Sequence, residues 1–336
     1  MSEESQLPRL AFELASRVWS DWSPTFDPPS GLLYHYTSAA GLLGIVPPDR
    51  LVTFRATHHR FLNDPDEGAL IDGIITEAAE EARKAMQPED ATWDAARQRA
   101  LAGVSGISRL VFYRTWYVVS FTELRDDLTQ WRLYGGDGAG YALAVRAGAI
   151  DAQVRPPAAQ GFLVRVVYRR RQQVELVTAA LHDALRLLRD PAIRAFAESG
   201  IDLNDLVGAA LRYFVAEARE LFSAMFKREQ FGLEREWRCV IVAPDPARLQ
   251  DIEGLTAAEE AQLRRVQFRD GNSIPVPYVE VPIHAAPLAI AEVWSGPALG
   301  RDLVAHAIPA FLRARGWRGN LDAVWQASAH GYRGRR

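Results

Sequence analysis

The chain has 336 residues, of which 48% are hydrophobic and 24% are charged, and its formal net charge at pH 7 is −3. This composition is that of an ordinary globular protein with enough apolar residues for a sizeable core, arranged as one large domain or two closely associated ones. The slightly acidic balance argues against wholesale nucleic-acid binding, so a nucleic acid would need a local basic patch.

The single cysteine, Cys239, excludes disulfides within the chain and any metal site made of several cysteines. No apolar run reaches the roughly 18 residues of a membrane span, and no signal-peptide pattern opens the sequence. We therefore expect a cytoplasmic protein without a membrane partner.

The first elements are a helix and a strand–helix–strand unit. Helical spacing over Leu7–Trp19, followed by prolines, predicts an N-terminal helix and linker over residues 1–30. A strand is predicted over Gly31–Thr37, then a short helix capped by Ser38, and a second strand over Leu51–Arg55.

The next segment alternates between helices and strands. Helices are predicted over Glu67–Met86 and Pro88–Leu101, and an aromatic and β-branched strand over Thr115–Thr122. The glycine-rich run Gly135–Gly140 superficially fits a dinucleotide fingerprint, but that fingerprint opens a helix, whereas this run leads into the strand Tyr141–Val145. We interpret it as a turn.

The second half contains a long helical block between strands. After a strand over Leu163–Tyr168, the pattern from Arg170 to Phe226 is almost wholly helical and predicts an insertion over about 169–231. The remaining predictions are strands over Glu236–Val242, Ile274–Val281, Ile290–Trp294 and Ala323–Ser328, and a helix over Leu299–Arg315. Together they indicate an α+β fold, with one domain over 31–328 and a basic tail over 329–336.

Polar residues on two of the predicted strands have two interpretations each. His35 and Tyr36 are adjacent and point to opposite faces; His35 is either a half-buried histidine among packed tyrosines or a hydroxyl-binding group beside a stacking Tyr36. Ser120 and Thr122 share one face, where their hydroxyls either satisfy a neighbouring loop or line a polar pocket.

A third polar group opens the predicted strand at 236. Glu234 and Glu236 occupy alternate positions, which would make both carboxylates face the same way. Such a pair needs compensation, either from Arg235 and Arg238 in a purely structural arrangement or from a substrate hydroxyl, and its protons would titrate as a coupled pair.

A metal-binding alternative is suggested by the turn after the second strand. His58 and His59 precede Asp64 and Glu67, and imidazoles and carboxylates suit magnesium, manganese or zinc. Because no established ligand spacing is present, we predict no metal.

Taken together, the motifs resemble those of a bacterial family of unknown function, the DUF2971 domain family, over roughly Leu33 to Pro297. The motifs that carry the resemblance are Tyr34–Thr37, Phe61–Glu67, Ser120–Thr122, Trp131–Gly135 and Glu234–Arg238. More distantly, the strand with His35, the strand with Ser120 and the late strand headed by glutamate are similar in layout to ADP-ribosyltransferases.

The second resemblance implies a split, mixed or antiparallel sheet and a role for each motif. His35 would bind a ribose of NAD, Tyr36 would stack on nicotinamide, and Ser120 would support the site. Glu236 would contact the nicotinamide ribose, and Glu234 corresponds to the upstream acid of the Glu-x-Glu subgroup, so the choice of catalytic glutamate stays open. The implied NAD-binding residues are His35, Tyr36, Thr37, Ser120, Thr122 and Trp131.

The resemblance thus implies an NAD-dependent ADP-ribosyltransferase or NAD glycohydrolase, with a bacterial toxin or defence effector as its biological setting. Cleavage of the bond between ribose and nicotinamide builds oxocarbenium-like charge, which a carboxylate stabilises. The acceptor would be an unidentified macromolecule or small molecule. The alternatives are a metal-dependent hydrolase or nuclease, and a non-catalytic module whose helical insertion recruits a protein.

Overall fold

The computed structural model describes most of the chain after residue 30. The described residues are 31–48, 51–62, 67–87, 91–104, 114–154, 161–187, 202–247, 257–271, 273–283, 289–321 and 323–331. The predicted helix over Leu7–Trp19 and the turn at Asn63–Asp66 lie outside them. None of the described helices is long and apolar enough to cross a membrane.

The chain divides into two compact units. A helical unit takes its described residues from within 64–112 and 167–231, and a sheet unit takes its residues from within 26–63, 113–166 and 232–336. The predicted insertion over 169–231 is therefore not a separate unit. It shares a unit with the two helices that precede the strand at 114, whereas the sequence analysis placed those helices in the same domain as the strands.

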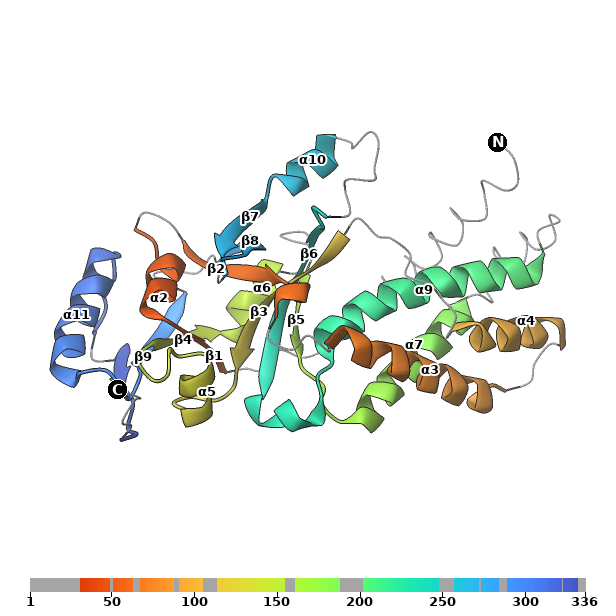
Figure 1. The fold of residues 1–336 in the computed structure, drawn as a ribbon, viewed down its shortest axis with the longest axis horizontal. Coiled ribbons are helices and arrows are strands. Elements are labelled where there is room, and N and C mark those ends of the chain that lie inside the picture. Colours follow the sequence, from red (N-terminus) through yellow and green to blue (C-terminus); the bar gives the residue numbers. More distant parts are fainter. Residues whose placement is uncertain are drawn as a thin grey trace. The chain divides into compact units, whose positions relative to one another are not determined.

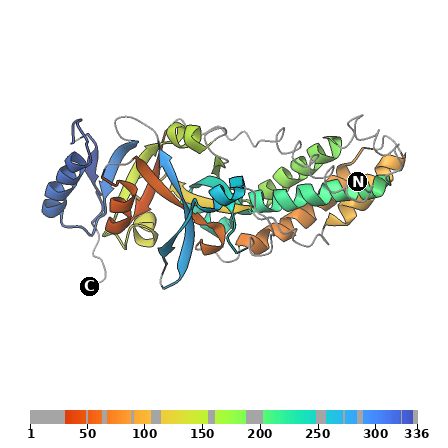
Figure 2. The ribbon, with the colours of Figure 1, turned by 90° about the horizontal axis from the view of Figure 1, so that it is seen from above.

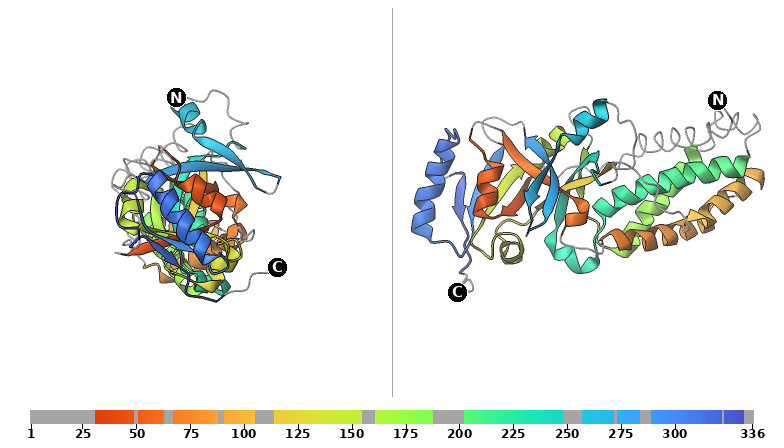
Figure 3. Two further views of the ribbon diagram at one scale, coloured as in Figure 1. Left: turned by 90° about the vertical axis from the view of Figure 1, so that its left-hand side faces the viewer. Right: turned by 45° about the horizontal axis from the view of Figure 1, so that its top comes forward.

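The helical unit is a bundle of long helices that run alongside one another (Figures 2 and 3). Its helices bury apolar residues such as Ile74, Leu181 and Phe214. The helix α3 packs on α7 and α9, and α4 packs on α9. Ion pairs at the surface join α3 to its neighbours, from Arg170 to Glu77 at 2.9 Å and from Arg219 to Asp72 at 2.7 Å. The bounds are Glu67–Ala85 for α3, Ala91–Ala102 for α4, Arg170–Leu187 for α7 and Leu203–Met225 for α9.

The sheet unit is built on a mostly antiparallel sheet of ten described strands (Figure 1). The main order is β10-β9-β4-β1-β3-β2-β8-β7, and β6 joins the other side of β3 and carries β5. The strands are β1 (Leu32–Thr37), β2 (Val52–His58), β3 (Arg114–Thr122), β4 (Tyr141–Arg146), β5 (Gly161–Arg165), β6 (Glu236–Pro244), β7 (Val266–Asp270), β8 (Pro275–Ile283), β9 (Ile290–Ser295) and β10 (Trp325–Ala327).

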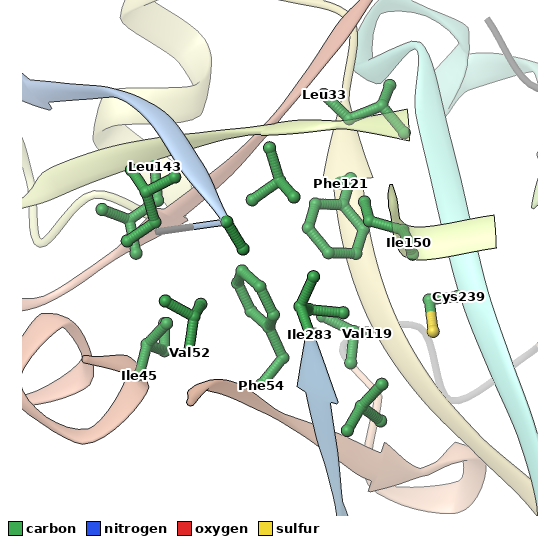
Figure 4. Close-up of a cluster of buried hydrophobic side chains, with 14 of the residues drawn as sticks. Leu33, Ile45, Val52, Phe54, Val119, Phe121, Leu143, Ile150, Cys239 and Ile283 are labelled. Atoms are coloured by element: carbon green, nitrogen blue, oxygen red, sulfur yellow. The ribbon is translucent and has the colours of Figure 1, made fainter. Parts of the chain in front are cut away.

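The strands alternate between two chemically different faces. One face, which we call the core face, carries Leu33, Phe54, Phe121, Leu143 and their neighbours in a single large apolar cluster (Figure 4). Helices supply the rest of that cluster: α2 (Ala39–Ile45), α6 (Ala147–Val154) and α11 (Arg301–Ala314). The remaining short elements are α5 (Leu128–Leu133), α10 (Ala257–Leu263), η2 (His59–Phe61) and η4 (Glu229–Glu234).

The opposite face, which we call the aromatic face, has a smaller cluster. Its buried members are Tyr34, Tyr36, Trp131, Ala142, Ala144 and Trp294, with Leu32 and Tyr134 packed against them. Trp131 comes from α5, whose N-terminus is capped by the Asp127 carboxylate accepting a hydrogen bond from the Gln130 amide at 2.9 Å. The helix α5 thus covers this face.

The sheet forks at β3. The register joins β1 to β3 at the single pair Tyr34–Thr122, whereas β2 pairs with β3 further back, at Thr57–Val118 and His58–Tyr117. On its other side β3 pairs with β6 along its whole length, from Arg114–Pro244 to Thr122–Glu236. The strands β1 and β2 therefore diverge on one side of a β3 that β6 supports on the other.

The α+β class and most predicted elements are confirmed. Ser38 caps α2 by accepting a hydrogen bond from the Gly41 amide at 3.1 Å, and the helix ends before Pro47. The glycine-rich run is a turn, with positive φ at Gly136, Asp137 and Gly138. The elements α6, α10 and β7 were not predicted, because they are short and carry no clear apolar period.

The turn also depends on close backbone packing, which gives a test. A Cβ atom at Gly140 would lie 2.3 Å from the Thr37 carbonyl oxygen and 2.7 Å from that of Gly135, whereas a Cβ atom at Gly148 in α6 meets nothing within 4 Å. We expect Gly140→Ala to lower the free energy of unfolding by about 1–3 kcal/mol. Gly148→Ala should raise it by about 0.5–1 kcal/mol. Urea unfolding of both variants checks this, and equal effects would contradict it.

Candidate functional site

The fork between β1 and β2 holds His35. Its imidazole lies on the core face, with ring centroids 5.3 Å from Phe54 and 5.7 Å from Phe121. Its Nδ1 is 2.8 Å from the carbonyl oxygen of Ser120, so the ring reaches across the gap where β1 leaves β3. Since a carbonyl oxygen only accepts, Nδ1–H is the donor, and the neutral ring then has an acceptor at Nε2. Burial lowers the pKa of His35, which favours this neutral form.

Ser120 and Thr122 share the aromatic face as the alternation predicts, but their surroundings differ. Ser120 is exposed at the fork, whereas Thr122 is buried. The Thr122 hydroxyl donates to the Glu234 carbonyl oxygen at 2.6 Å and accepts from the Leu124 amide at 3.1 Å. The Thr122 hydroxyl therefore forms hydrogen bonds with backbone groups of neighbouring loops. This is one of the two roles that the sequence allowed for it.

Tyr36 and Trp131 form the buried centre of the aromatic face. Tyr36 is 7% exposed and Trp131 0%, and their rings meet edge to face with centroids 4.7 Å apart. The Tyr36 hydroxyl donates to the Leu124 carbonyl oxygen and accepts from the Asp127 amide, both at 3.0 Å. Burial raises the pKa of Tyr36. In this arrangement Tyr36 is a packing residue on the opposite side of the sheet from His35, and it offers no open ring for stacking.

Glu234 and Glu236 lie in different backbone environments. Glu234 ends η4, Arg235 has a positive φ of 44°, and β6 begins only at Glu236. The strand alternation that the sequence analysis applied to both residues therefore does not reach Glu234. The Glu234 carboxylate accepts a hydrogen bond from the Tyr134 hydroxyl at 3.1 Å, and Tyr134 itself is half-buried against the aromatic face.

Glu236 is paired with a buried arginine. The Arg238 guanidinium donates from Nε to Glu236 Oε1 at 2.9 Å and from a terminal nitrogen to Oε2 at 3.2 Å. Both residues are buried, with 6% of Glu236 and 1% of Arg238 exposed. The structural interpretation predicted that an arginine would offset the negative charge of the glutamates. For Glu236, Arg238 does so through this bidentate pair.

The histidines of the metal alternative have other partners. His58 is buried, its Nδ1 accepts a hydrogen bond from the Arg60 amide at 3.2 Å, and its Nε2 is 3.6 Å from an Asp245 carboxylate oxygen. Asp64 lies outside the described residues, and only the backbone of Glu67 is described. Among the residues that the structure describes, no group of three or more metal-ligating side chains comes together.

Two residues that matter here were only partly predicted from the sequence. Tyr134 was noted only as part of a motif, because nothing in the sequence indicates that α5 brings its hydroxyl to Glu234. Arg238 was one of two possible partners, and the period of two along β6 was the signal that it shares a face with Glu236. The side chains of Glu234 and Tyr134, on the aromatic face where Ser120 is exposed, form the candidate site. The His35 ring lies at the fork on the core face and contacts the same strand through the Ser120 carbonyl oxygen.

The comparisons with known proteins identify one family. Residues 130–239 match the family described as "Protein of unknown function (DUF2971)". The match includes Trp131, Tyr134 and both glutamates, which supports the resemblance seen in the sequence, and it begins after His35 and Ser120. No curated protein and no solved structure matches the chain.

The buried pair gives a stability test. Replacing either Glu236 or Arg238 by methionine leaves the other charge buried, and we expect each single variant to lose about 3–5 kcal/mol of unfolding free energy. The double variant should lose clearly less than the sum, since no buried charge remains in the pair. Denaturant unfolding of the four proteins measures the coupling, and additive losses would show that the two side chains do not act as a pair.

The His35 environment gives a pH test. Because folding lowers the pKa of His35, the unfolded chain takes up this proton first as the pH falls through the ordinary value of 6.5. The stabilising contribution is therefore full above that value and declines below it. We expect this decline to be missing in His35→Asn, which keeps a donor for the Ser120 carbonyl oxygen. Urea unfolding at several pH values checks this, and identical pH profiles would contradict it.

Proposed function

We propose that the chain cleaves the bond between nicotinamide and ribose in NAD, and transfers the ADP-ribosyl group to an acceptor or to water. The observation that carries the proposal is the Glu234 carboxylate, which accepts a hydrogen bond from the Tyr134 hydroxyl at 3.1 Å, while the Thr122 hydroxyl holds the Glu234 backbone to the strand that also carries Ser120. The forked, mostly antiparallel sheet supports the ADP-ribosyltransferase-like arrangement that the motif order implies.

The two glutamates have separable roles in this proposal. Both oxygens of Glu236 already accept hydrogen bonds from the Arg238 guanidinium, so Glu236 supports the start of β6. Glu234 is also buried, with 7% exposed, and its carboxylate accepts a hydrogen bond from the hydroxyl of Tyr134, whose ring is half-buried on the aromatic face. We therefore assign the contact with the nicotinamide ribose to Glu234, in place of the Glu236 assignment that the motif layout suggested.

The chemistry requires negative charge that is present before the reaction. As the glycosidic bond breaks, positive charge develops on the ribose ring, and a fixed carboxylate stabilises that transition state more than the ground state. Thr122 fixes the backbone of Glu234, and Tyr134 fixes its side chain. Both contacts reduce the reorganisation needed during the reaction.

In this proposal, His35 at the fork and Tyr134 on the aromatic face would contact different parts of the substrate. A neutral His35 with Nδ1–H on Ser120 has an acceptor for a ribose hydroxyl at Nε2, which fits the hydroxyl-binding role inferred from the motif. The half-buried ring of Tyr134 replaces the buried Tyr36 as the aromatic surface for nicotinamide. Tyr36 and Trp131 support that surface from beneath.

The decisive experiment measures nicotinamide release from NAD, with and without cell lysate as acceptor. We expect Glu234→Gln to lower kcat about 100- to 1,000-fold, as for the loss of other fixed charge-stabilising groups, with a smaller change in KM. Tyr134→Phe should lower it less, by about tenfold. Asp302→Asn, an exposed carboxylate on α11, serves as the matched control and should leave turnover unchanged.

Several outcomes would overturn this. A wild-type protein that neither binds NAD nor releases nicotinamide rules out the proposed function. If Glu234→Gln keeps full activity and Glu236→Gln loses activity, both measured per amount of folded protein, then Glu236 and not Glu234 contacts the ribose. Loss of activity in chelator and its recovery with manganese would favour the metal-dependent hydrolase instead.

A further inference from the structure

Asp126 connects three parts of the sheet unit that are distant in sequence. It has a positive φ of 52° in the loop between β3 and α5. Its Oδ1 accepts from the Trp131 indole Nε1 at 2.8 Å, and its Oδ2 accepts from the Ala329 amide at 3.0 Å. Its carbonyl oxygen lies 2.8 Å from His330 Nε2, which must be the donor because a carbonyl only accepts. One loop residue thus holds both α5 and the C-terminal segment.

The C-terminal segment is anchored independently of Asp126. Just before it, β10 pairs in parallel with β9, and the Ser328 amide donates to the Ser295 carbonyl oxygen at 2.9 Å. Arg301 donates to the Ser328 carbonyl oxygen at 3.2 Å, and Ser328 is only 3% exposed. Residues 328–330 are therefore held in place by contacts that do not involve Asp126, and they can in turn fix the position of Asp126.

From Asp126 the contacts lead to the candidate site. Trp131 packs against Tyr36, and its carbonyl oxygen accepts from the Gly138 amide at 3.0 Å. The Tyr36 hydroxyl joins the two ends of the loop, at Leu124 and Asp127. Tyr134 packs on this cluster, and its hydroxyl reaches Glu234.

We propose that Asp126 is a positioning residue for the candidate site, and that Ser328–His330 is a structural part of that site. Together they set the orientation of Trp131, and through it the place of Tyr134, so that the Tyr134 hydroxyl meets the Glu234 carboxylate. The proposal deepens the proposed function and rests on it.

An aspartate is specifically required at position 126. Both of its oxygens face donors, and an asparagine would turn its NH₂ group toward one of them and leave a donor unpaired. Burial tends to raise the pKa of Asp126, but hydrogen bonds from Ser328, Trp131 and the Ala329 amide outweigh burial, so the pKa is lowered. The carboxylate therefore keeps its charge across the range in which the site would work.

The test is a double-mutant cycle between Asp126→Asn and Tyr134→Phe, read as kcat and KM for nicotinamide release from NAD. In the wild-type background, Asp126→Asn should lower kcat by up to about tenfold, the loss expected of Tyr134→Phe itself, and leave KM within about threefold. In the Tyr134→Phe background it should have almost no further effect, since the contact that it positions is already lost.

Two further variants separate positioning from a general loss of structure. Trp131→Phe removes the indole donor together with part of a fully buried ring system, so it should lower kcat at least as much as Asp126→Asn does. Asp126→Asn should then add almost nothing in the Trp131→Phe background, while Asp302→Asn should have no effect in either background. Effects of Asp126→Asn and Tyr134→Phe that multiply, or an unchanged kcat in Asp126→Asn, would overturn the proposal.

Failure of the proposed function is distinguishable from failure of the contact itself. If the wild type releases no nicotinamide, both the proposed function and the catalytic role of Asp126 are wrong. Thermal unfolding of Asp126→Asn, Trp131→Phe and the double variant then still reports whether the two side chains are coupled: the losses in midpoint should be smaller together than their sum. Additive losses would show that even the structural link is absent.

Discussion

The hydrophobic core on one face of the sheet determines where the polar chemistry of this protein lies. Leu33, Phe54, Phe121 and Cys239 all point into that core, and the pleat of a strand sends each neighbouring side chain the other way. Burial of the core face therefore places Tyr36, Thr122 and Glu236 on the aromatic face. A shift of any strand by one residue would exchange the two faces and bury charges without partners.

Every polar group that this arrangement buries needs a partner, and the partners explain much of the sheet unit. Arg238 neutralises Glu236 on the same strand, Thr122 holds the backbone before β6, and Tyr36 satisfies two backbone groups of the β3–α5 loop. The buried thiol of Cys239 is unreactive, since burial raises its pKa to about 12 and so keeps it protonated.

The sequence predicted elements where local rules are strong. Ser38 as a helix cap and the glycine-rich run as a turn depend on a few neighbouring residues, and both were predicted correctly. The strand β7 was missed because it is short, with most of its residues exposed, so it has no apolar period to detect. The union of α3 and α4 with α7 and α9 could not be foreseen, because helix pairing between distant segments leaves no local signal.

For the candidate site, the sequence by itself singled out His35, Ser120, Thr122 and the two glutamates as polar groups on or beside apolar strands. It also determined, through alternation, that His35 and Tyr36 face opposite ways. Only the tertiary structure decided which glutamate is paired with arginine, that Tyr134 reaches Glu234, and that residues 328–330 support the loop at Asp126. These contacts join residues up to 204 positions apart, as for Asp126 and His330. The separation of Glu234 from the strand alternation of β6 comes with a positive φ at Arg235. Local periodicity tells only which side chains of a single strand share a face. The partner of a buried charge depends on how several strands and helices pack together.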